Sequence, residues 1–226
     1  MLTAELHVHS SLSHDGRDPV DLILEQAAGV GLDAIAVTDH DQIDASLEAV
    51  ELASEYDLIG IPGIEISTAH GHVIALGITD TIEPGLPFVE TVQRIHEAGG
   101  IAVIPHPFQQ SRSGVLTKID KQTVIDHADA IEVYNSRLLT GRANRQADRF
   151  ATRYGLPKTA GSDAHVCEMV GQAVTHIDAI EPTAESIIEA IAAGRTEIEG
   201  KRTPWHISFM QASGGVKRRI ARRLPW

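Results

Sequence analysis

The chain has 226 residues, a length typical of one domain with at most a small appendage. Hydrophobic residues make up 42% of the chain, enough for a buried core, which argues against a disordered protein. No run of about eighteen apolar residues predicts a transmembrane helix, and the N-terminus is not typical of a signal peptide. The single cysteine excludes an internal disulfide framework and indicates the reducing cytoplasm as the expected location.

The net charge of −12 is unevenly distributed. All charged residues after Gly200 are basic, so residues 1–200 are more acidic than the whole chain. This acidic body argues against a general nucleic-acid-binding surface. We expect one main domain over 1–200 and a basic tail over 201–226, in which apolar residues at 216, 220 and 224 predict a short amphipathic helix. The tail is expected to dock on the acidic body of the chain or on another anionic surface.

Short apolar runs alternate with helix-like segments. In chain order, we expect a strand at 2–8, a helix at 18–29, a strand at 34–38, a helix at 42–56, strands at 58–67 and 72–78, a helix at 87–98, a strand at 101–104, a helix at 121–127, a strand at 130–134, a helix at 141–154, strands at 158–161 and 172–177, a helix at 182–193 and a strand at 196–200. Asp18 and Pro19 predict the N-cap and first turn of the first helix. Ile43, Leu47 and Val50 are expected to face the core from the second helix. These repeated units predict an α/β fold with a largely parallel sheet.

Acidic and histidine side chains recur where the predicted strands end. His72 is the exception, because it opens its strand. An open, doubly wound sheet gathers its ligands at one switch point. Ligand side chains at the ends of nearly all strands are instead typical of a barrel, whose active site lies at the face formed by the C-terminal ends of its strands. We therefore expect the strands to close into a barrel.

Nine residues form the predicted metal-ligand set. They are His7, His9, Asp15, His40, Glu65, His72, His106, Asp163 and His165. Neutral imidazole and carboxylate groups are the ligands of zinc, manganese and iron(II). Since nine ligands exceed what one ion can use, we expect two to three divalent ions about four ångströms apart. His70 is the alternative to His72, and the remaining histidines, His14 among them, are expected to be structural.

Six motifs resemble, in their order, those of the PHP (polymerase and histidinol phosphatase) family. They are His7-Val8-His9-Ser10, Ser13-His14-Asp15-Gly16, Val37-Thr38-Asp39-His40-Asp41, Gly63-Ile64-Glu65-Ile66-Ser67, Ile104-Pro105-His106-Pro107 and Gly161-Ser162-Asp163-Ala164-His165. The resemblance covers about residues 1–200. It implies a distorted (β/α)7 TIM-like barrel, a trinuclear metal site and hydrolysis of phosphate esters by a metal-bridging hydroxide.

The resemblance also implies which residues hold each ion. The first ion would be held by His7, His9, Glu65 and Asp163. The second would be held by Glu65, His72 and His106. The third would be held by Asp15, His40 and His165. Asp163 and His165 would therefore be catalytic together with Asp39, which is expected to orient a ligand histidine. Guanidinium groups grip phosphate in a fork, so Arg17, Arg112 and Arg137 are expected to contact the substrate. Asn135 is also an expected substrate contact, because it lies at the end of its predicted strand.

The leading interpretation is a metal-dependent phosphoesterase that hydrolyses a phosphomonoester or phosphodiester of a small metabolite or nucleotide, or of a short oligonucleotide. An exonuclease or RNA-processing nuclease of the same family is the alternative, although the acidic surface argues against long polymers. A non-catalytic metal-binding regulatory module is the alternative from another class. Amide hydrolysis is the weaker interpretation, because no lysine ends a predicted strand and Glu65 can supply the bridging carboxylate.

Overall fold

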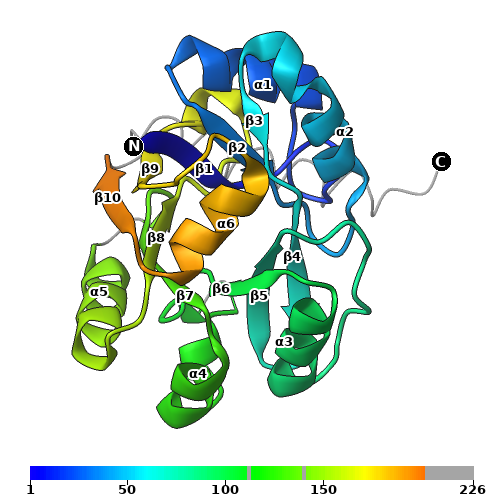
Figure 1. The fold of residues 1–226 in the computed structure, drawn as a ribbon. Helices are drawn as coiled ribbons and strands as arrows, with labels where there is room; N and C mark the ends of the chain where they lie inside the picture. The colour runs from blue at the N-terminus through cyan, green and yellow to red at the C-terminus, as the bar shows by residue number, and fades with distance from the viewer. Residues whose placement is uncertain (111–112, 139–140, 202–226) are drawn as a thin grey trace, which may run out of the picture.

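The computed structural model describes residues 1–110, 113–138 and 141–201, in which strands and helices alternate (Figure 1). The strands are β1 (Leu2–Val8), β2 (Ala34–Val37), β3 (Ile59–Gly60), β4 (Gly63–Thr68), β5 (Gly71–Leu76), β6 (Ile101–Ile104), β7 (Ala130–Asn135), β8 (Lys158–Gly161), β9 (Ala173–Ile177) and β10 (Thr196–Gly200). The helices are α1 (Val20–Gly29), α2 (Asp44–Leu52), α3 (Phe88–Glu97), α4 (Lys121–His127), α5 (Arg142–Tyr154) and α6 (Ala184–Ala192). The predicted α/β class is confirmed, and most element boundaries shift by only one or two residues.

The strands form two mixed five-stranded sheets, with orders β10-β9-β1-β2-β3 and β4-β5-β6-β7-β8. Parallel pairing joins β1 to β2, β2 to β3, β6 to β7 and β7 to β8, whereas the other neighbours are antiparallel. The prediction of a largely parallel sheet is therefore wrong. A single closed barrel is not seen in the described part of the chain, where isolated bridges connect the two sheets at Val8–Ala164 and His40–Glu65.

The strand expected at 58–67 is in fact two strands in different sheets. The Ile61 amide donates to the Ile35 carbonyl of the first sheet at 2.8 Å, and the Gly77 amide of the second donates to the Pro62 carbonyl at 2.7 Å. Proline has no amide proton to continue a ladder. A Cβ on Gly63 would lie 2.9 Å from the Leu76 side chain, so glycine allows the close approach at which the chain changes sheets.

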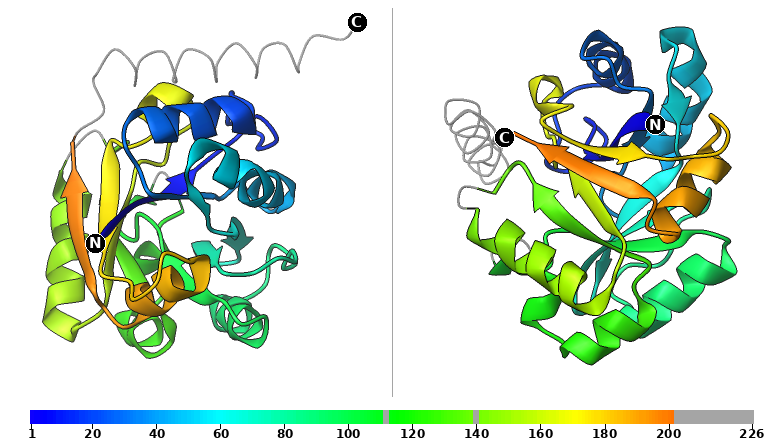
Figure 2. Two further views of the ribbon diagram at one scale, coloured as in Figure 1. Left: turned by 45° about the horizontal axis from the view of Figure 1, so that its top comes forward. Right: turned by 60° about the vertical axis from the view of Figure 1, so that its left-hand side comes forward.

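The core between the two sheets contains small and branched side chains from both. Ala4, Ala34, Ile74 and Val103 pack there with Ile187 of α6. This helix covers the end of the strands opposite the predicted metal ligands. The other helices lie outside the sheets, with α1 and α2 beside the first and α3, α4 and α5 beside the second (Figures 1 and 2). One end of this core is therefore closed by apolar packing and the other is left for polar groups.

Two helix predictions are corrected by the packing. Leu47 and Val50 of α2 are exposed, and the helix buries the small side chains of Ala45 and Ala49 instead. A Cβ on Gly60 would lie only 2.5 Å from the Val50 Cα, and so close an approach leaves no room for large inward side chains. At α1, the N-cap residue is Pro19 and not Asp18, which the sequence had suggested.

The predicted basic tail and its amphipathic helix lie outside the described residues, apart from Lys201. Its docking therefore stays a prediction. Within the described ranges, none of the helices has both the length and the apolar character needed to cross a bilayer.

Candidate metal centre

The predicted ligands converge where the ends of the two sheets meet. The His9 amide donates to the Ala164 carbonyl at 2.8 Å, which ties the end of β1 to the turn after β8. The Glu65 amide donates to the Asp39 carbonyl at 3.1 Å, which ties β4 to the end of β2. These two junctions bring side chains from four strand ends into one buried cluster.

Glu65 lies at the centre of this cluster, with only 1% of its surface exposed. Its two carboxylate oxygens face opposite groups of imidazoles. Glu65 Oε1 lies 2.8 Å from His72 Nδ1 and 3.2 Å from His106 Nε2. Glu65 Oε2 lies 3.2 Å from His9 Nε2, 3.3 Å from His40 Nδ1 and 3.4 Å from His7 Nε2. A carboxylate in this position can bridge two cations, as the sequence analysis expects of Glu65.

Asp163, His165 and Asp15 form the other end of the cluster. Asp163 Oδ1 lies 3.3 Å from His165 Nδ1 and 3.7 Å from His9 Nε2. His165 Nε2 lies 2.6 Å from Asp15 Oδ2, which is 3.7 Å from His40 Nε2. All nine predicted ligands are therefore in one continuous set of contacts.

The chemistry of this cluster fits divalent ions. Ligand atoms lie within 4.8 Å of one another in several groups: His7, Glu65 and His106; His7, His9 and Asp163; His9, His40 and Glu65; His9, Asp15 and His165; and His14, Asp15 and His40. Nδ1 of His9 and Nδ1 of His106 are buried without a hydrogen bond among the described residues. His9 Nε2 and His40 Nδ1 lie close to Glu65 Oε2 but are not aligned for a hydrogen bond with it. Since buried polar atoms are rarely left unpaired, the lone pairs of these nitrogens are suited to coordinate metal ions.

The structure distinguishes His72 from His70. His72 contacts Glu65, whereas His70 Nδ1 accepts a hydrogen bond from the Phe88 amide at 3.2 Å. His72 opens its strand and still reaches the cluster, because β5 runs antiparallel to β4 and pairs His72 with Ser67. His14 was expected to be structural, but its ring centroid lies 4.9 Å from that of His40, at the edge of the cluster. Its position next to Asp15 in the sequence was the available signal for this placement.

Mutual contacts shift the pKa values of the cluster in opposite directions. Burial lowers the pKa of His9 to about 3, helped by neighbouring His165. Burial also opposes a charge on His40, but Glu65 and Asp15 outweigh it and raise the His40 pKa to about 9. The pKa of buried Glu65 is well below its usual value despite desolvation, because His40 and His7 stabilise the carboxylate. The cluster without bound ions therefore holds carboxylates together with protonated and neutral imidazoles.

We expect manganese binding to strengthen with pH. A protonated imidazole cannot coordinate a metal, and His40 stays protonated below a pKa of about 9. The apparent affinity should therefore rise by up to about tenfold per pH unit between pH 6.5 and 9 while one proton is displaced. Calorimetric titrations in two buffers of different ionisation enthalpy would measure affinity and proton release together. An affinity that is constant over this range would contradict the prediction.

Backbone strain accompanies the ligands at three strand ends. Asp41, His106 and Asp163 have φ values of 56°, 33° and 50°, in the left-handed region that non-glycine residues seldom adopt. Each lies shortly after the end of a strand: Asp41 after β2, His106 after β6 and Asp163 after β8. Such strain is typical of functional sites, where the surrounding structure must impose it.

Glu132 is a buried carboxylate that the sequence analysis missed. Its Oε1 lies 2.9 Å from His7 Nδ1, and its Oε2 accepts hydrogen bonds from the His106 amide at 2.8 Å and from Asn135 Nδ2 at 3.0 Å. A carboxylate on Nδ1 fixes the histidine tautomer that leaves Nε2 for a metal. Glu132 therefore positions two predicted ligands at once.

Replacing Glu132 with glutamine is expected to weaken manganese binding by roughly 10- to 100-fold, the usual effect of losing such a supporting group. The amide nitrogen would face either the His7 ring or the His106 amide, and both are donors. Equilibrium dialysis with manganese would measure the affinity. The matched control is Glu197→Gln, a change at an exposed carboxylate on β10. Equal affinities in the two variants would show that Glu132 does not support the site.

Glu5 is a second buried carboxylate beside the cluster. It accepts hydrogen bonds from the amides of Ser162 at 2.9 Å, Gly171 at 3.1 Å and His7 at 3.2 Å, and from the Ser162 hydroxyl. Burial raises the pKa of Glu5 to about 7. Glu5 thus joins β1 to the segment that carries Asp163.

The remaining predicted residues have varied surroundings. Asp39 accepts hydrogen bonds from the Ser10 amide and hydroxyl at 2.6 and 2.5 Å, so it holds the chain after His9 rather than a histidine ring. Asn135 is buried and donates to Glu132 and, at 3.4 Å, to Asp163, which turns its amide toward carboxylates rather than toward solvent. Arg17 is half-buried in the loop before α1, and Arg112 lies outside the described residues.

Arg137, predicted to contact the substrate, lies against Asp163 and His165. One of its terminal nitrogens donates to Asp163 Oδ1 at 3.0 Å and lies 2.8 Å from His165 Nε2. Burial and this guanidinium lower the pKa of His165. The imidazole of His165 is therefore neutral at neutral pH, the form that can bind a metal.

Sequence comparisons identify relatives over most of the chain. A family model described as PHP-associated matches residues 141–196. The uncharacterized protein MJ0417 of Methanocaldococcus jannaschii is 30% identical over 76% of this chain and 69% of its own length. MJ1587 of the same organism is 31% identical over 65% of this chain and 89% of its own length. A phosphoribosyl 1,2-cyclic phosphate 1,2-diphosphodiesterase of Eggerthella lenta is 34% identical over 41% of this chain and 37% of its own length.

Solved structures share the fold at lower identity. A two-domain protein from Bacteroides vulgatus, which contains a predicted PHP-like metal-dependent phosphoesterase, superposes with a TM-score of 0.75 at 22% identity. That match covers 88% of this chain and 65% of the other chain. The lesion-specific endonuclease PfuEndoQ of Pyrococcus furiosus has a TM-score of 0.64 at 17% identity, covering 87% of this chain and 57% of its own. Relatives, fold and ordered motifs agree: the chain belongs to the PHP (polymerase and histidinol phosphatase) family.

Proposed function

We propose that this protein hydrolyses a phosphate ester of a small metabolite or nucleotide, using two to three divalent ions held by the nine-residue cluster. The observation that carries the proposal is Glu65, a buried carboxylate whose two oxygens face different groups of histidines. Manganese, iron or zinc suits these nitrogen and oxygen ligands. The relatives named as a cyclic phosphate diphosphodiesterase and a lesion-specific endonuclease support phosphate-ester chemistry for this fold.

In the proposed assignment, His7, His9, Glu65 and Asp163 would hold the first ion. The second would be held by Glu65, His72 and His106. The third would be held by Asp15, His40 and His165. Bound ions would neutralise phosphate oxygens and lower the pKa of a water molecule toward neutrality. His9 Nε2 lies 3.2 Å from Glu65 Oε2 and 3.7 Å from Asp163 Oδ1, so it lies among the groups that would hold the first ion.

The residues of the chain would orient the phosphate while one water molecule is consumed. The water oxygen bonds to phosphorus, the ester P–O bond breaks, and the departing alcohol gains a proton. Arg137 lies at the edge of the cluster, and its Nε is buried without a hydrogen bond among the described residues. Its guanidinium can therefore hold a non-bridging phosphate oxygen beside Asp163 and His165. We place Arg137 as the substrate contact and Asp39 and Asn135 as groups that position the cluster.

The proposal predicts manganese-dependent hydrolysis of p-nitrophenyl phosphate or of bis(p-nitrophenyl) phosphate by the full chain. His7→Ala should abolish this activity, because His7 contacts Glu65 and Glu132. His127→Ala is the control, since His127 lies on α4 and its Nδ1 contacts the Thr123 carbonyl at 2.9 Å. Activity that survives in His7→Ala would contradict the proposed site. Metal binding without hydrolysis of either ester would favour the non-catalytic regulatory module.

A further inference from the structure

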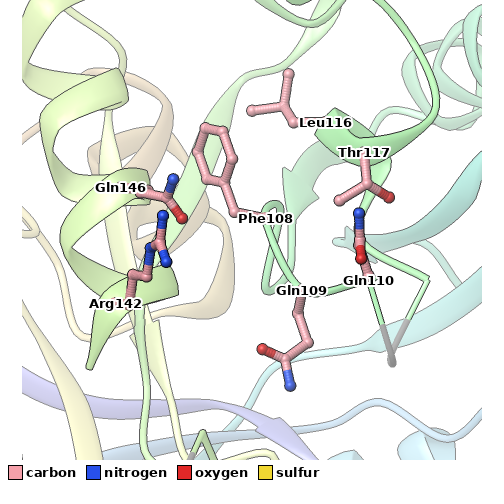
Figure 3. A pocket seen from close by; sticks show the side chains of 7 residues that line it. All are labelled: Phe108, Gln109, Gln110, Leu116, Thr117, Arg142 and Gln146. Atoms are coloured by element: carbon pink, nitrogen blue, oxygen red, sulfur yellow. The ribbon is translucent and has the colours of Figure 1, made fainter. Parts of the chain in front are cut away.

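An open pocket of about 680 Å³ lies around Phe108, in the segment that follows His106 (Figure 3). Its described lining comes from two places in the chain, the loop after β6 and the first turns of α5. The lining residues are Phe108, Gln109, Gln110, Leu116, Thr117, Arg142 and Gln146. Figure 3 shows Arg142 and Gln146 on one side of Phe108, and Leu116, Thr117 and Gln110 on the other. None of these residues belongs to the proposed metal ligands.

One wall of the pocket is tied to the proposed ligands of the second ion. The Gln109 amide donates to the His106 carbonyl at 3.0 Å, and the His72 amide donates to the Ser113 carbonyl at 3.0 Å. The loop doubles back so tightly that a Cβ on Gly114 would lie 2.6 Å from the Pro107 carbonyl oxygen. The loop that forms this wall is therefore bonded to His106 near its start and to His72 near Ser113.

The other wall is tied to the proposed phosphate side of the cluster. Asn144, in the first turn of α5, donates from Nδ2 to the Asn135 carbonyl at 3.0 Å. Asn135 in turn donates to Asp163 and Glu132. Since β6 and β7 are parallel neighbours, the segments that follow them flank the same edge of the sheet. A substrate with its phosphate at the cluster would place its remaining part between these walls.

The lining favours a planar group with many hydrogen-bonding positions. Phe108 is held by an edge-to-face contact with Phe150, at a centroid distance of 5.9 Å, and offers an aromatic surface to the pocket. Three glutamine amides supply both donors and acceptors. Among the seven lining residues Arg142 is the one ionisable group, which suits an additional anionic group and not a cation.

We infer that this pocket binds the nucleobase of a nucleotide whose phosphate lies at the metal cluster. Bases stack on aromatic side chains, and glutamine amides pair with the edges of bases. The inference rests on the proposed function and specifies the substrate class for the same site. Phe108 and Gln146 are then specificity-determining residues, which act on the departing part of the substrate and not on the reacting phosphate.

The test compares the four ribonucleoside 5′-monophosphates with ribose 5-phosphate, which has the same sugar phosphate without a base. With manganese, kcat/KM for at least one nucleotide should exceed that for ribose 5-phosphate by about tenfold or more. Phe108→Leu and Gln146→Ala should each remove much of this preference and leave ribose 5-phosphate hydrolysis unchanged. Gln122→Ala is the control, because Gln122 is exposed on α4 and bonds to Asp126.

Equal kcat/KM values for nucleotides and ribose 5-phosphate, or variants that slow both equally, would overturn the nucleobase subsite. If neither ester is hydrolysed, the proposed function fails, and calorimetric binding of the same compounds decides the subsite separately. Nucleotide binding that weakens about tenfold in Phe108→Leu, but not in Gln122→Ala, would support the subsite even then. Binding that does not depend on the base would overturn it.

Discussion

Replacing Glu65 with glutamine is expected to lower manganese-dependent phosphoesterase activity by at least about three orders of magnitude, because several kcal/mol of transition-state stabilisation depend on the bound ions. Glutamine keeps the shape of the side chain but removes the charge that faces the five histidines around it. The side-chain NH2 group of glutamine is also a hydrogen-bond donor, which cannot bind a cation. The bound manganese should fall to about one ion or fewer per chain.

The measurement pairs turnover with metal content on the same preparation. Glu197→Gln is the matched control, since it makes the same chemical change at an exposed carboxylate of β10. Circular dichroism would show whether the variant stays folded. A folded Glu65→Gln protein that keeps both its manganese and its activity would contradict the role of Glu65 as a bridging carboxylate.

Replacing Asp163 with asparagine is expected to reduce activity by roughly 10²- to 10⁴-fold, the range found when a group that acts directly in the reaction is removed. Asp163 contacts His9, His165 and Arg137, so the change removes one of the two carboxylate charges, those of Asp163 and Asp15, at that end of the cluster. Its φ of 50° is in the left-handed region. Asparagine tolerates this conformation, which separates the effect of charge from the effect of backbone strain.

Asp41→Asn provides a close control. Asp41 has a φ of 56° and follows His40, and its Oδ1 accepts a hydrogen bond from the Ser67 amide at 2.7 Å. Asparagine can keep that hydrogen bond, so activity should stay within about twofold of the original, as expected for a change that removes no catalytic contact. Similar losses in both variants would mean that the turn, and not the Asp163 charge, limits the reaction.

The convergence of the nine candidate ligands could be predicted because their signals are local. Histidines two apart on a strand, such as His7 and His9, point to one face, and polar residues after apolar runs mark strand ends. Glu132 and Glu5 were missed because each lies inside an apolar strand, where the pattern suggested only a core. A charged residue within such a run was the available signal, since an acid is buried only when it has partners.

The sheet arrangement could not be predicted because it depends on contacts between distant segments. The division of residues 58–67 between two sheets rests on the approach of Gly60 to Val50 and of Gly63 to Leu76. Similarly, the antiparallel hairpin of β4 and β5 decides that His72 reaches Glu65 from the beginning of its strand. Apolar runs identify strands, but they do not specify which neighbours the strands pair with.

We propose that the nine residues together form one metal centre. The most direct test is the metal content of the full chain, purified without chelator or affinity metal and measured by inductively coupled plasma mass spectrometry. We predict about two to three equivalents of manganese, iron or zinc per chain, as expected of a multinuclear site, and a clear reduction in Glu65→Gln. Less than about half an equivalent, with no uptake when manganese is added, would contradict the account, because a preformed set of deprotonated ligands should bind the ion.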